Sequence, residues 1–435
     1  MTDIHKFGGA SVRDAQAIRR VAEILQQHSD QKAARLLVVS AMAKTTNALE
    51  EIAQAGFAGK TEESFGMLNR LRSWHEAVVE ELFAERPKEK QSLLAELNDL
   101  FVEAEWLLEE EPPQNYDFFY DQLIPLGELL STRILAAWLK TEGLPVVWLD
   151  ARDFIRTDDS FREAHILWEE TISRCRQQLT PLLKENKIPL TQGFIGSTSD
   201  NYNSTLGREG SDYTAAVLAY ALDARRVHIW KDVPGVLTAD PRIFENPPRL
   251  DRLSYREAIE MTYYGAQVLH PKTIKPLQNK NIPLEVRSFL QPERAGSLIQ
   301  NEAEETYPPI ISIKRQQALL QISTRDFSFV AEQHISLLFQ HIARLHLRVN
   351  LMQNSAISFS LCLSDQDGKI ERLVEEIQEL FKVQVQRHLE LINLRHARPE
   401  TREEVLKNRL VLLEQRLGNT VQLVVKKLEK VKYKN

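Results

Sequence analysis

Three glycine-rich segments of the chain each follow a predicted strand, an arrangement suited to holding phosphate. They read KFGGAS from Lys6, GFIGS from Gly193 and GREGSD from Gly207. Backbone N–H groups at a glycine turn entering a helix have no partner within the helix, and the helix dipole adds partial positive charge there. Both effects favour an anion, so we expect phosphate chemistry at these turns.

Lys6 supplies a charged group beside the first of these turns. It precedes the Gly8–Gly9 pair by one residue, so its ammonium could meet the oxygens of a phosphoryl group in transfer. The alternative for this short motif alone is a tight turn with a surface lysine.

The GREGSD segment combines backbone freedom with charge. Gly207 and Gly210 let the backbone approach a ligand closely. Ser211 is placed to cap the helix that follows, and Asp212 comes next.

Two charged residues suit an amino-acid substrate. Arg208 offers a planar guanidinium that matches a carboxylate, and Glu128, in PLGELLSTR, could take an ammonium group. An amino acid needs both partners at once. Either residue alone is more often a surface charge or a member of an ion pair.

Composition excludes several classes of protein. The net charge of -6 argues against a general nucleic-acid binder, and the two cysteines, Cys175 and Cys362, provide no disulfide framework. No segment reaches the roughly 18 apolar residues of a membrane span, and the first residues show no apolar signal region. We expect a cytoplasmic protein that binds neither membranes nor nucleic acid.

Strands alternate with helices over residues 1–300, which predicts an α/β fold with a mainly parallel sheet sandwiched by helices. We expect this domain to carry a helical excursion at about 60–115. Ser11, with Asp14 three residues on, is the expected N-cap of the first helix. A later helix, over 166–186, is expected to break near Pro181.

A second domain is expected over 310–435. From Ile310 the order is strand, helix, strand, strand, helix, which is most of a ferredoxin-like α+β unit. Residues 384–426 offer further strands with one short helix between them, and they are interpreted as a reduced second copy.

With these residues placed, the chain resembles the aspartate kinases (aspartokinases), which are members of the amino-acid-kinase family with a C-terminal regulatory region of ACT type. The resemblance covers nearly the whole chain. Its segments, in the order of the family, are KFGGASV, VVSAMAKTTNAL, PLGELLSTRI, GFIGS, GREGSDYTAA, WKDVPGVLTADPR and GAQVLHPKT.

The resemblance implies transfer of a phosphoryl group from MgATP to the side-chain carboxylate of L-aspartate. It assigns Lys6 to stabilise that phosphoryl group and Asp212 to orient Lys6. It implies that four residues hold aspartate, with Glu128 on the amine and Arg208 on the α-carboxylate; the four are Thr46, Glu128, Arg208 and Ser211. It implies phosphate and nucleotide contacts at Gly8, Gly9, Ser11, Lys231, Asp232, Asp240, Pro241 and Arg242.

Chemistry agrees with these roles. A carboxylate with a reference pKa of about 3.9 is already ionised at neutral pH, so it needs no general base. Neutralising two anions that must meet requires Lys6, backbone amides and Mg²⁺. We expect ATP to hold Mg²⁺, with no metal ligands from the protein, because no carboxylate cluster has the spacing of a metal cage.

The chain departs from the pattern of the family at several positions. Ala10 and Glu209 replace a threonine and a glycine, and Leu237 and Gln267 replace a tyrosine and a lysine; Lys231 stands where threonine is common. We expect Glu209 to point away from the site or to pair with a nearby cation. Asn350 and Ala356 replace the acidic effector-binding residues of lysine-sensitive relatives, so the effector is left open.

The sequence is compatible with three functions. The first is an aspartate kinase of lysine, threonine and methionine biosynthesis, without a downstream dehydrogenase, which the resemblance implies to be a homodimer with an amino-acid effector at its ACT region. The second is another amino-acid or carbamate kinase of the same fold. The third is a catalytically weak amino-acid-sensing subunit, which the departures at Ala10, Glu209 and Gln267 would favour.

Overall fold

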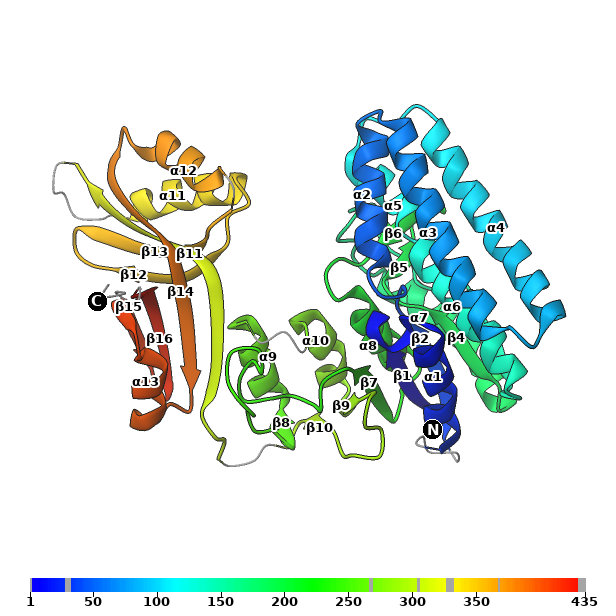
Figure 1. Ribbon diagram of the computed structural model, residues 1–435. Helices are drawn as coiled ribbons and strands as arrows, with labels where there is room; N and C mark the ends of the chain where they lie inside the picture. The colour runs from blue at the N-terminus through cyan, green and yellow to red at the C-terminus, as the bar shows by residue number, and fades with distance from the viewer. Residues whose placement is uncertain are drawn as a thin grey trace, which may run out of the picture. The chain divides into compact units, whose positions relative to one another are not determined.

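The computed structural model describes residues 2–27, 33–265, 269–302, 306–325, 332–366 and 368–428. The chain divides into two compact units (Figure 1). The first contains residues 1–237, 249–262 and 267–304, and the second contains 238–248, 263–266 and 305–435. Each unit is described by itself.

The first unit is built on an eight-stranded sheet with the order β3-β4-β2-β1-β7-β9-β10-β8. Every neighbouring pair is parallel except β9 and β10, so the predicted mainly parallel sheet is confirmed. The strands are β1 (Thr2–Phe7), β2 (Ala34–Val39), β3 (Val146–Trp148), β4 (Ile188–Gln192), β7 (Arg226–Lys231), β8 (Arg252–Ser254), β9 (Leu284–Ser288) and β10 (Ser297–Gln300).

Helices surround this sheet (Figure 1). They are α1 (Ala15–Gln27), α2 (Thr45–Phe57), α3 (Thr61–Leu82), α4 (Pro87–Glu109), α5 (Tyr116–Leu123), α6 (Leu126–Thr141), α7 (Trp168–Lys184), α8 (Gly210–Ala221), α9 (Tyr255–Tyr263) and α10 (Pro271–Asn279), with short 3-10 turns at Gly9–Val12 and Ala151–Asp153. The expected helical excursion forms the long helices α3 and α4, which lie side by side. Their apolar faces join the core that also contains α1, α2 and α6.

Two expected helix boundaries were wrong. Ser11 does not cap α1, because it lies in the 3-10 turn and the carboxylate of Asp14 accepts the N–H of Ala17 at 2.7 Å instead. Pro181 does not break α7, which continues to Lys184. Pro181 lies in the last turn on the solvent side, where the carbonyl of the exposed Gln177 that loses its partner can bond to water.

The chain turns at Phe194, shortly after β4, where its φ is 71°. The part after the turn, β5 (Ile195–Ser197), pairs with β6 (Asn203–Thr205) in a separate two-stranded antiparallel sheet. Gly193 has no room for a side chain, because a Cβ there would lie 2.5 Å from the Cβ of Ser211 on α8. The turn therefore packs directly on the start of α8.

The second unit is a six-stranded antiparallel sheet with the order β12-β13-β11-β14-β16-β15. Its strands are β11 (Ile310–Thr324), β12 (Val349–Asn354), β13 (Ser358–Ser364), β14 (Phe381–Arg395), β15 (Arg409–Leu417) and β16 (Thr420–Lys427), and its helices are α11 (Glu332–Arg344), α12 (Lys369–Ile377) and α13 (Pro399–Leu406). Helices α11 and α12 bury their apolar sides on the β11–β13 part of the sheet (Figure 1). This architecture confirms the expected ferredoxin-like α+β region.

No helix in the described ranges has the length and apolar character needed to cross a membrane.

Candidate active site

A cavity of about 890 Å³ lies beyond the carboxyl ends of the central strands of the first unit. Ligands of parallel α/β sheets bind at this edge. Lys6 reaches the cavity from β1, Glu128 from the first turn of α6, and the 207–212 segment from the start of α8. The other lining residues are Gly9, Ser40, Ala41, Ala43, Thr46, Asn47, Glu50, Asp117, Tyr120, Phe161, Arg162, Glu163 and Phe194.

Lys6 and Asp212, which are 206 positions apart in the sequence, form an ion pair in this cavity. Lys6 Nζ lies 2.7 Å from Asp212 Oδ1, and Lys231 Nζ lies 3.1 Å from Asp212 Oδ2. Burial opposes ionisation of Asp212, but the charges of Lys231 and Lys6 outweigh it and hold its pKa below the usual range. Asp212 therefore fixes two ammonium groups at the edge of the cavity.

The side chain of Glu209 points to a neighbouring lysine. Its carboxylate lies 3.4 Å from Lys231 Nζ, which confirms that it pairs with a neighbouring cation. Its φ is 57°, a left-handed conformation that costs a non-glycine residue roughly 1 kcal/mol. The expected capping role of Ser211 was wrong, because α8 begins at Gly210 with Glu209 at the N-cap position, and Ser211 lies within the first turn.

Glu128 is a buried carboxyl group, and one of its oxygens has no hydrogen-bond partner. Its Oε1 accepts the N–H of Ala41 at 3.3 Å, whereas its Oε2 is buried and has no hydrogen-bond partner. Burial raises the pKa of Glu128 to about 8, against a smaller opposing effect of that N–H and of Lys6. Gly127 lets α6 pack this close to α2, since a Cβ there would lie 3.0 Å from Thr45 Cγ2. A cation that entered the cavity would restore the charge of Glu128.

Arg208 and Thr46 also line the cavity. Arg208 is exposed, and no side chain or carbonyl in the described part of the chain bonds to its guanidinium. Its five N–H donors are therefore available to a ligand.

The first glycine turn packs tightly against the loop after β2. A Cβ at Gly9 would lie 2.7 Å from the carbonyl oxygen of Ala41, and the N–H of Ala43 donates to the carbonyl of Gly9. At Gly8 the nearest atom to a Cβ would be Lys6 Nζ, at 3.4 Å. The turn therefore sits beside the Lys6 ammonium. Ser11 lies behind it, and its hydroxyl donates to the carbonyl of Trp230 at 3.4 Å.

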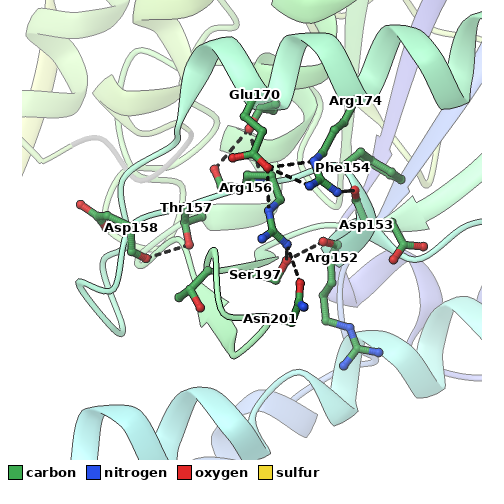
Figure 2. Close-up of polar contacts among 12 residues, drawn as sticks. Arg152, Asp153, Phe154, Arg156, Thr157, Asp158, Glu170, Arg174, Ser197 and Asn201 are labelled. Carbon is green, nitrogen blue, oxygen red and sulfur yellow. Dashed lines mark hydrogen bonds and ion pairs between the residues drawn. The ribbon is translucent and has the colours of Figure 1, made fainter.

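The segment 156–166 forms one wall of the cavity, which sequence reasoning missed. Figure 2 shows the buried guanidinium of Arg156 bonded to Ser197 and Asn201, at 2.5 and 3.2 Å, with Glu170 at 3.4 Å from its Nε. This network anchors the start of the segment to the sheet of β5 and β6. The segment then contributes Phe161, Arg162 and Glu163 to the cavity.

Arg162 in this wall is also held from α5. The carboxylate of Asp121 accepts its N–H at 2.9 Å and the N–H and hydroxyl of Thr205 at 2.8 and 2.7 Å. Nothing in the sequence indicates this role, because a charged loop such as RTDDSFREAH is most often a solvated surface.

Some of the expected nucleotide contacts do not line this cavity. Asp232 is exposed and does not line the cavity. Asp240, Pro241 and Arg242 belong to the second unit, where the Arg242 guanidinium pairs with Asp240 at 2.7 Å. Gln267 lies outside the described residues.

The described residues contain one grouping with the composition of a metal site, formed by Asp3, His5 and His228 on β1 and β7. The protein itself supplies partners to this grouping. Arg225 binds both oxygens of Asp3, at 2.8 and 2.5 Å, and His228 Nδ1 lies 2.9 Å from Glu285. These contacts favour a structural role. In the cavity, Asp212 is similarly occupied by two lysines, so the described residues there do not form a cation cage.

Comparison with known proteins agrees with this geometry. The amino acid kinase family matches residues 1–288. Lysine-sensitive aspartokinase 3 of Escherichia coli is 34% identical over 90% of this chain and 86% of its own length. The chloroplastic aspartokinase 3 of Arabidopsis thaliana is 32% identical over 91% of this chain and 71% of its own length.

Among solved structures, E. coli aspartokinase III in complex with aspartate and ADP superposes with a TM-score of 0.82 at 32% identity. The match covers 98% of this chain and 96% of that one. The same enzyme in complex with lysine and aspartate gives a TM-score of 0.80. Clostridium acetobutylicum aspartate kinase, at 20% identity and a TM-score of 0.71, shares the fold. The chain therefore belongs to the amino acid kinase family and, within it, to the aspartokinases.

Proposed function

We propose that this protein is an aspartate kinase, which transfers the γ-phosphoryl group of ATP to the side-chain carboxylate of L-aspartate and forms 4-phospho-L-aspartate. One observation carries the proposal. A single cavity is lined by an ammonium held for phosphate, a guanidinium available to a carboxylate, and a buried carboxyl oxygen without a partner, which belong to Lys6, Arg208 and Glu128.

Each charged group of aspartate has a partner in this scheme. The guanidinium of Arg208 takes the α-carboxylate in a bidentate pair. The carboxylate of Glu128 takes the ammonium, which supplies the cation that its second oxygen lacks. Thr46 and Ser211, which line the same cavity, complete the aspartate site with their hydroxyl groups. The side-chain carboxylate is then left to face Lys6.

Phosphoryl transfer needs charge neutralisation more than proton transfer. The attacking carboxylate, with a reference pKa of about 3.9, is ionised at neutral pH, so the site requires no general base. The Lys6 ammonium, oriented by Asp212, stabilises the negative charge on the transferred group, as do the backbone amides at Gly8 and Gly9. Mg²⁺ bound to the phosphates of ATP supplies further charge neutralisation.

For the nucleotide we keep the contacts that the resemblance to the family implies. Its proposed contacts are Gly8, Gly9, Ser11, Lys231, Asp232, Asp240, Pro241 and Arg242. Support for Lys231 comes from its position beside Asp212, which places its ammonium next to that of Lys6.

The proposal extends to regulation and assembly. We assign residues 1–300 to catalysis and 310–435 to an ACT-type regulatory region that binds an amino-acid effector and pairs with a second copy in a homodimer. The enzyme would then act in lysine, threonine and methionine biosynthesis in the cytoplasm. One contact argues against lysine as the effector. The Asn350 amide oxygen already accepts a hydrogen bond from Lys314 Nζ at 3.0 Å. The ammonium of a bound lysine at this amide would therefore meet a like charge.

Trapping with hydroxylamine tests the proposed activity. The purified protein, incubated with ATP, Mg²⁺, aspartate and hydroxylamine, should form aspartyl hydroxamate at a rate that depends on aspartate. Product formed with acetate, glutamate or carbamate, but not with aspartate, would identify another kinase of the same fold. Absence of hydroxamate with all of these acceptors would contradict the proposal and favour a sensing subunit.

A further inference from the structure

The segment before α8 holds a strained residue for which the proposed reaction, as described so far, has no use. Glu209 adopts a left-handed backbone conformation between two glycines, Gly207 and Gly210, where glycine would be free of strain. Strained residues persist where the surrounding structure favours them, and they often mark functional sites. The side chain of Glu209 shows what favours it here.

Glu209 is the outermost member of a row of alternating charges. The row runs from Glu209 to Lys231 at 3.4 Å, from Lys231 to Asp212 at 3.1 Å, and from Asp212 to Lys6 at 2.7 Å. Two ammonium groups and two carboxylates give it no net charge. Exposure is 32% for the Glu209 side chain, 17% for Lys231, none for Asp212 and 7% for Lys6, so Glu209 is the most exposed member of the row. An anion that enters the cavity therefore meets Glu209 before it meets Asp212.

The two carboxylates of the row differ in how firmly they are held. Asp212 is buried between two ammonium groups and stays ionised, as its lowered pKa indicates. Glu209 has one ammonium partner, and burial together with the nearby Asp212 raises its pKa, against the opposing charge of Lys231. A further anion beside Lys231 would weaken the hold on Glu209 and leave Asp212 in place.

We infer that the Glu209 carboxylate occupies, in the empty enzyme, the place at the Lys231 ammonium that the terminal phosphate of the nucleotide takes during the reaction. Glu209 is thus a displaceable counter-ion and a positioning residue, which holds Lys231 against Asp212 until ATP arrives. Lys231 then joins Lys6 in contacting the phosphate. This inference rests on the proposed function only in naming ATP as the incoming anion.

Competition between two anions for one cation predicts how the nucleotide affinity responds to substitution. Removing the Glu209 charge removes the competitor, so the nucleotide should bind more tightly. Removing the Lys231 charge should weaken nucleotide binding and leave the Glu209 carboxylate unpaired beside the phosphate, where it repels the phosphate. Removing both charges should recover part of the affinity, because the repulsion disappears. Two residues that acted independently would give additive effects.

The experiment measures binding of Mg²⁺ with β,γ-methylene-ATP, and separately with ADP, by titration calorimetry of the full chain without aspartate. The variants are Glu209→Gln, Glu209→Gly, Lys231→Gln and the double variant Glu209→Gln/Lys231→Gln. Glu63→Gln is the matched control, because it removes the same charge from an exposed pair with Lys60 on α3, outside the cavity. Thermal melting of each variant establishes that it is folded.

Glu209→Gln should tighten binding of the ATP analogue about three- to tenfold and binding of ADP less than twofold, and Glu209→Gly should do the same. Lys231→Gln should weaken binding of the analogue at least tenfold, and the double variant should bind more tightly than Lys231→Gln. Weaker binding in both Glu209 variants, equal gains for the analogue and ADP, or additive effects in the double variant would overturn the inference.

The outcome is separable from that of the proposed activity. If the affinities follow the expected pattern but no aspartyl hydroxamate forms, the inference stands and the assignment of aspartate fails. If hydroxamate forms but Glu209→Gln leaves nucleotide affinity unchanged, the activity stands and the inference fails.

Discussion

Two groups of charged residues gather around strands β1 and β7. One lies along these strands and the neighbouring β9, and the other lies at the carboxyl ends of β1 and β7 and the start of α8. The two groups differ in where their partners come from. The strand cluster consists of Asp3, His5, Arg225, His228 and Glu285. The cavity cluster consists of Lys6, Glu209 and Asp212, which line the same cavity as Glu128 and Arg208, and of Lys231, which pairs with Glu209 and Asp212.

In the strand cluster the chain pairs its own charges. Arg225 and His228 outweigh the effect of burial and hold the pKa of Asp3 below its usual range. Burial lowers the pKa of His5, which remains neutral and accepts a hydrogen bond from Trp230 Nε1 at 3.3 Å. Its ring stacks on that of His228, with centroids 4.7 Å apart. His5 Nε2 is buried without a hydrogen-bond partner, but the charged groups of the cluster pair with one another, which favours a structural role.

At the cavity, by contrast, a carboxyl group and a guanidinium lack partners. Glu128 keeps a buried oxygen without a hydrogen bond, and the described residues offer no partner to the Arg208 guanidinium. Buried polar groups are nearly always satisfied in folded proteins, so exceptions need an explanation. The comparison teaches that charge burial alone does not identify an active site. Incomplete pairing beside a cavity is the more informative feature.

The largest expected effect tests the cavity cluster. Lys6→Ala should lower the rate of aspartyl hydroxamate formation by about a thousandfold, or about 4 kcal/mol, because the transferred group loses its ammonium. The variant should fold, since Asp212 keeps Lys231 as a partner. Rate measurements and thermal melting check both parts. Lys60→Ala, at an exposed lysine on the surface, is the control. Normal turnover in Lys6→Ala would contradict its assigned role.

The next effect tests the strand cluster. Asp3→Asn leaves Arg225 and His228 without their shared carboxylate, so the free energy of unfolding should fall by about 3 kcal/mol at pH 7. Because the folded pKa of Asp3 is lowered, its contribution is present above the unfolded pKa of about 4 and is lost as pH falls below that value. Denaturant titration from pH 3 to 7 measures this loss.

The Michaelis constants of the folded Asp3→Asn variant should be unchanged. A variant of normal stability whose KM for aspartate is raised would place the strand cluster in the active site and abolish the distinction between the two clusters.

Arg208→Ala should raise the KM for aspartate about 10- to 100-fold, which corresponds to the loss of charged hydrogen bonds worth about 1.5 to 3 kcal/mol. Because Arg208 has no partner in the described part of the chain, its removal should leave the melting temperature unchanged. Arg208→Lys keeps the charge without the planar guanidinium, so its KM for aspartate should lie between those of the parent enzyme and Arg208→Ala. An effect confined to the KM for ATP would be evidence against the assignment.

The smallest effect concerns pH. With a pKa of about 8, Glu128 is mostly protonated at pH 6.5 in the empty enzyme, yet only its carboxylate attracts the ammonium of aspartate. The KM for aspartate should therefore fall about tenfold as pH rises from 6.5 to 8. Glu128→Gln should remove this dependence. A KM that is flat with pH in the parent enzyme would show that Glu128 does not bind the amine.

Glu128→Gln also sharpens the comparison through stability. The folded pKa lies above that of the unfolded chain, so Glu128 destabilises the folded state increasingly as pH rises from the unfolded value of about 4 to 8. The glutamine variant should melt at a higher temperature than the parent at pH 8, whereas Asp3→Asn should melt at a lower one. A lower melting temperature for Glu128→Gln would mean that its charge is already compensated.

Much of the fold could be predicted because its signals are local. The apolar run of β2, the glycine turn after β1 and the helical spacing of α6 each depend on a few neighbouring residues. Strands β8 and β10, at one end of the sheet, were missed, since three or four residues are too few to show a periodic pattern.

The site could be predicted only in part. Lys6, Glu128, Arg208 and Asp212 were found through motifs and resemblance, and they meet at one cavity. The strand cluster was not found, because it depends on the pairing of β1 with β7, which opposes His5 to His228 across more than two hundred residues. The turn at Phe194 was missed for a similar reason, since contact with α8 fixes it.

The contact between Gly193 and Ser211 limits how this enzyme can be altered. A methyl group at position 193 would clash with Ser211, and a methyl group at position 210 would lie 2.5 Å from the ring of Phe194. Both positions therefore exclude every residue larger than glycine. Any substitution there would displace the start of α8 and, with it, Asp212, the ion-pair partner of Lys6. Libraries intended to change substrate preference should therefore keep these two glycines fixed and vary the 156–166 wall instead.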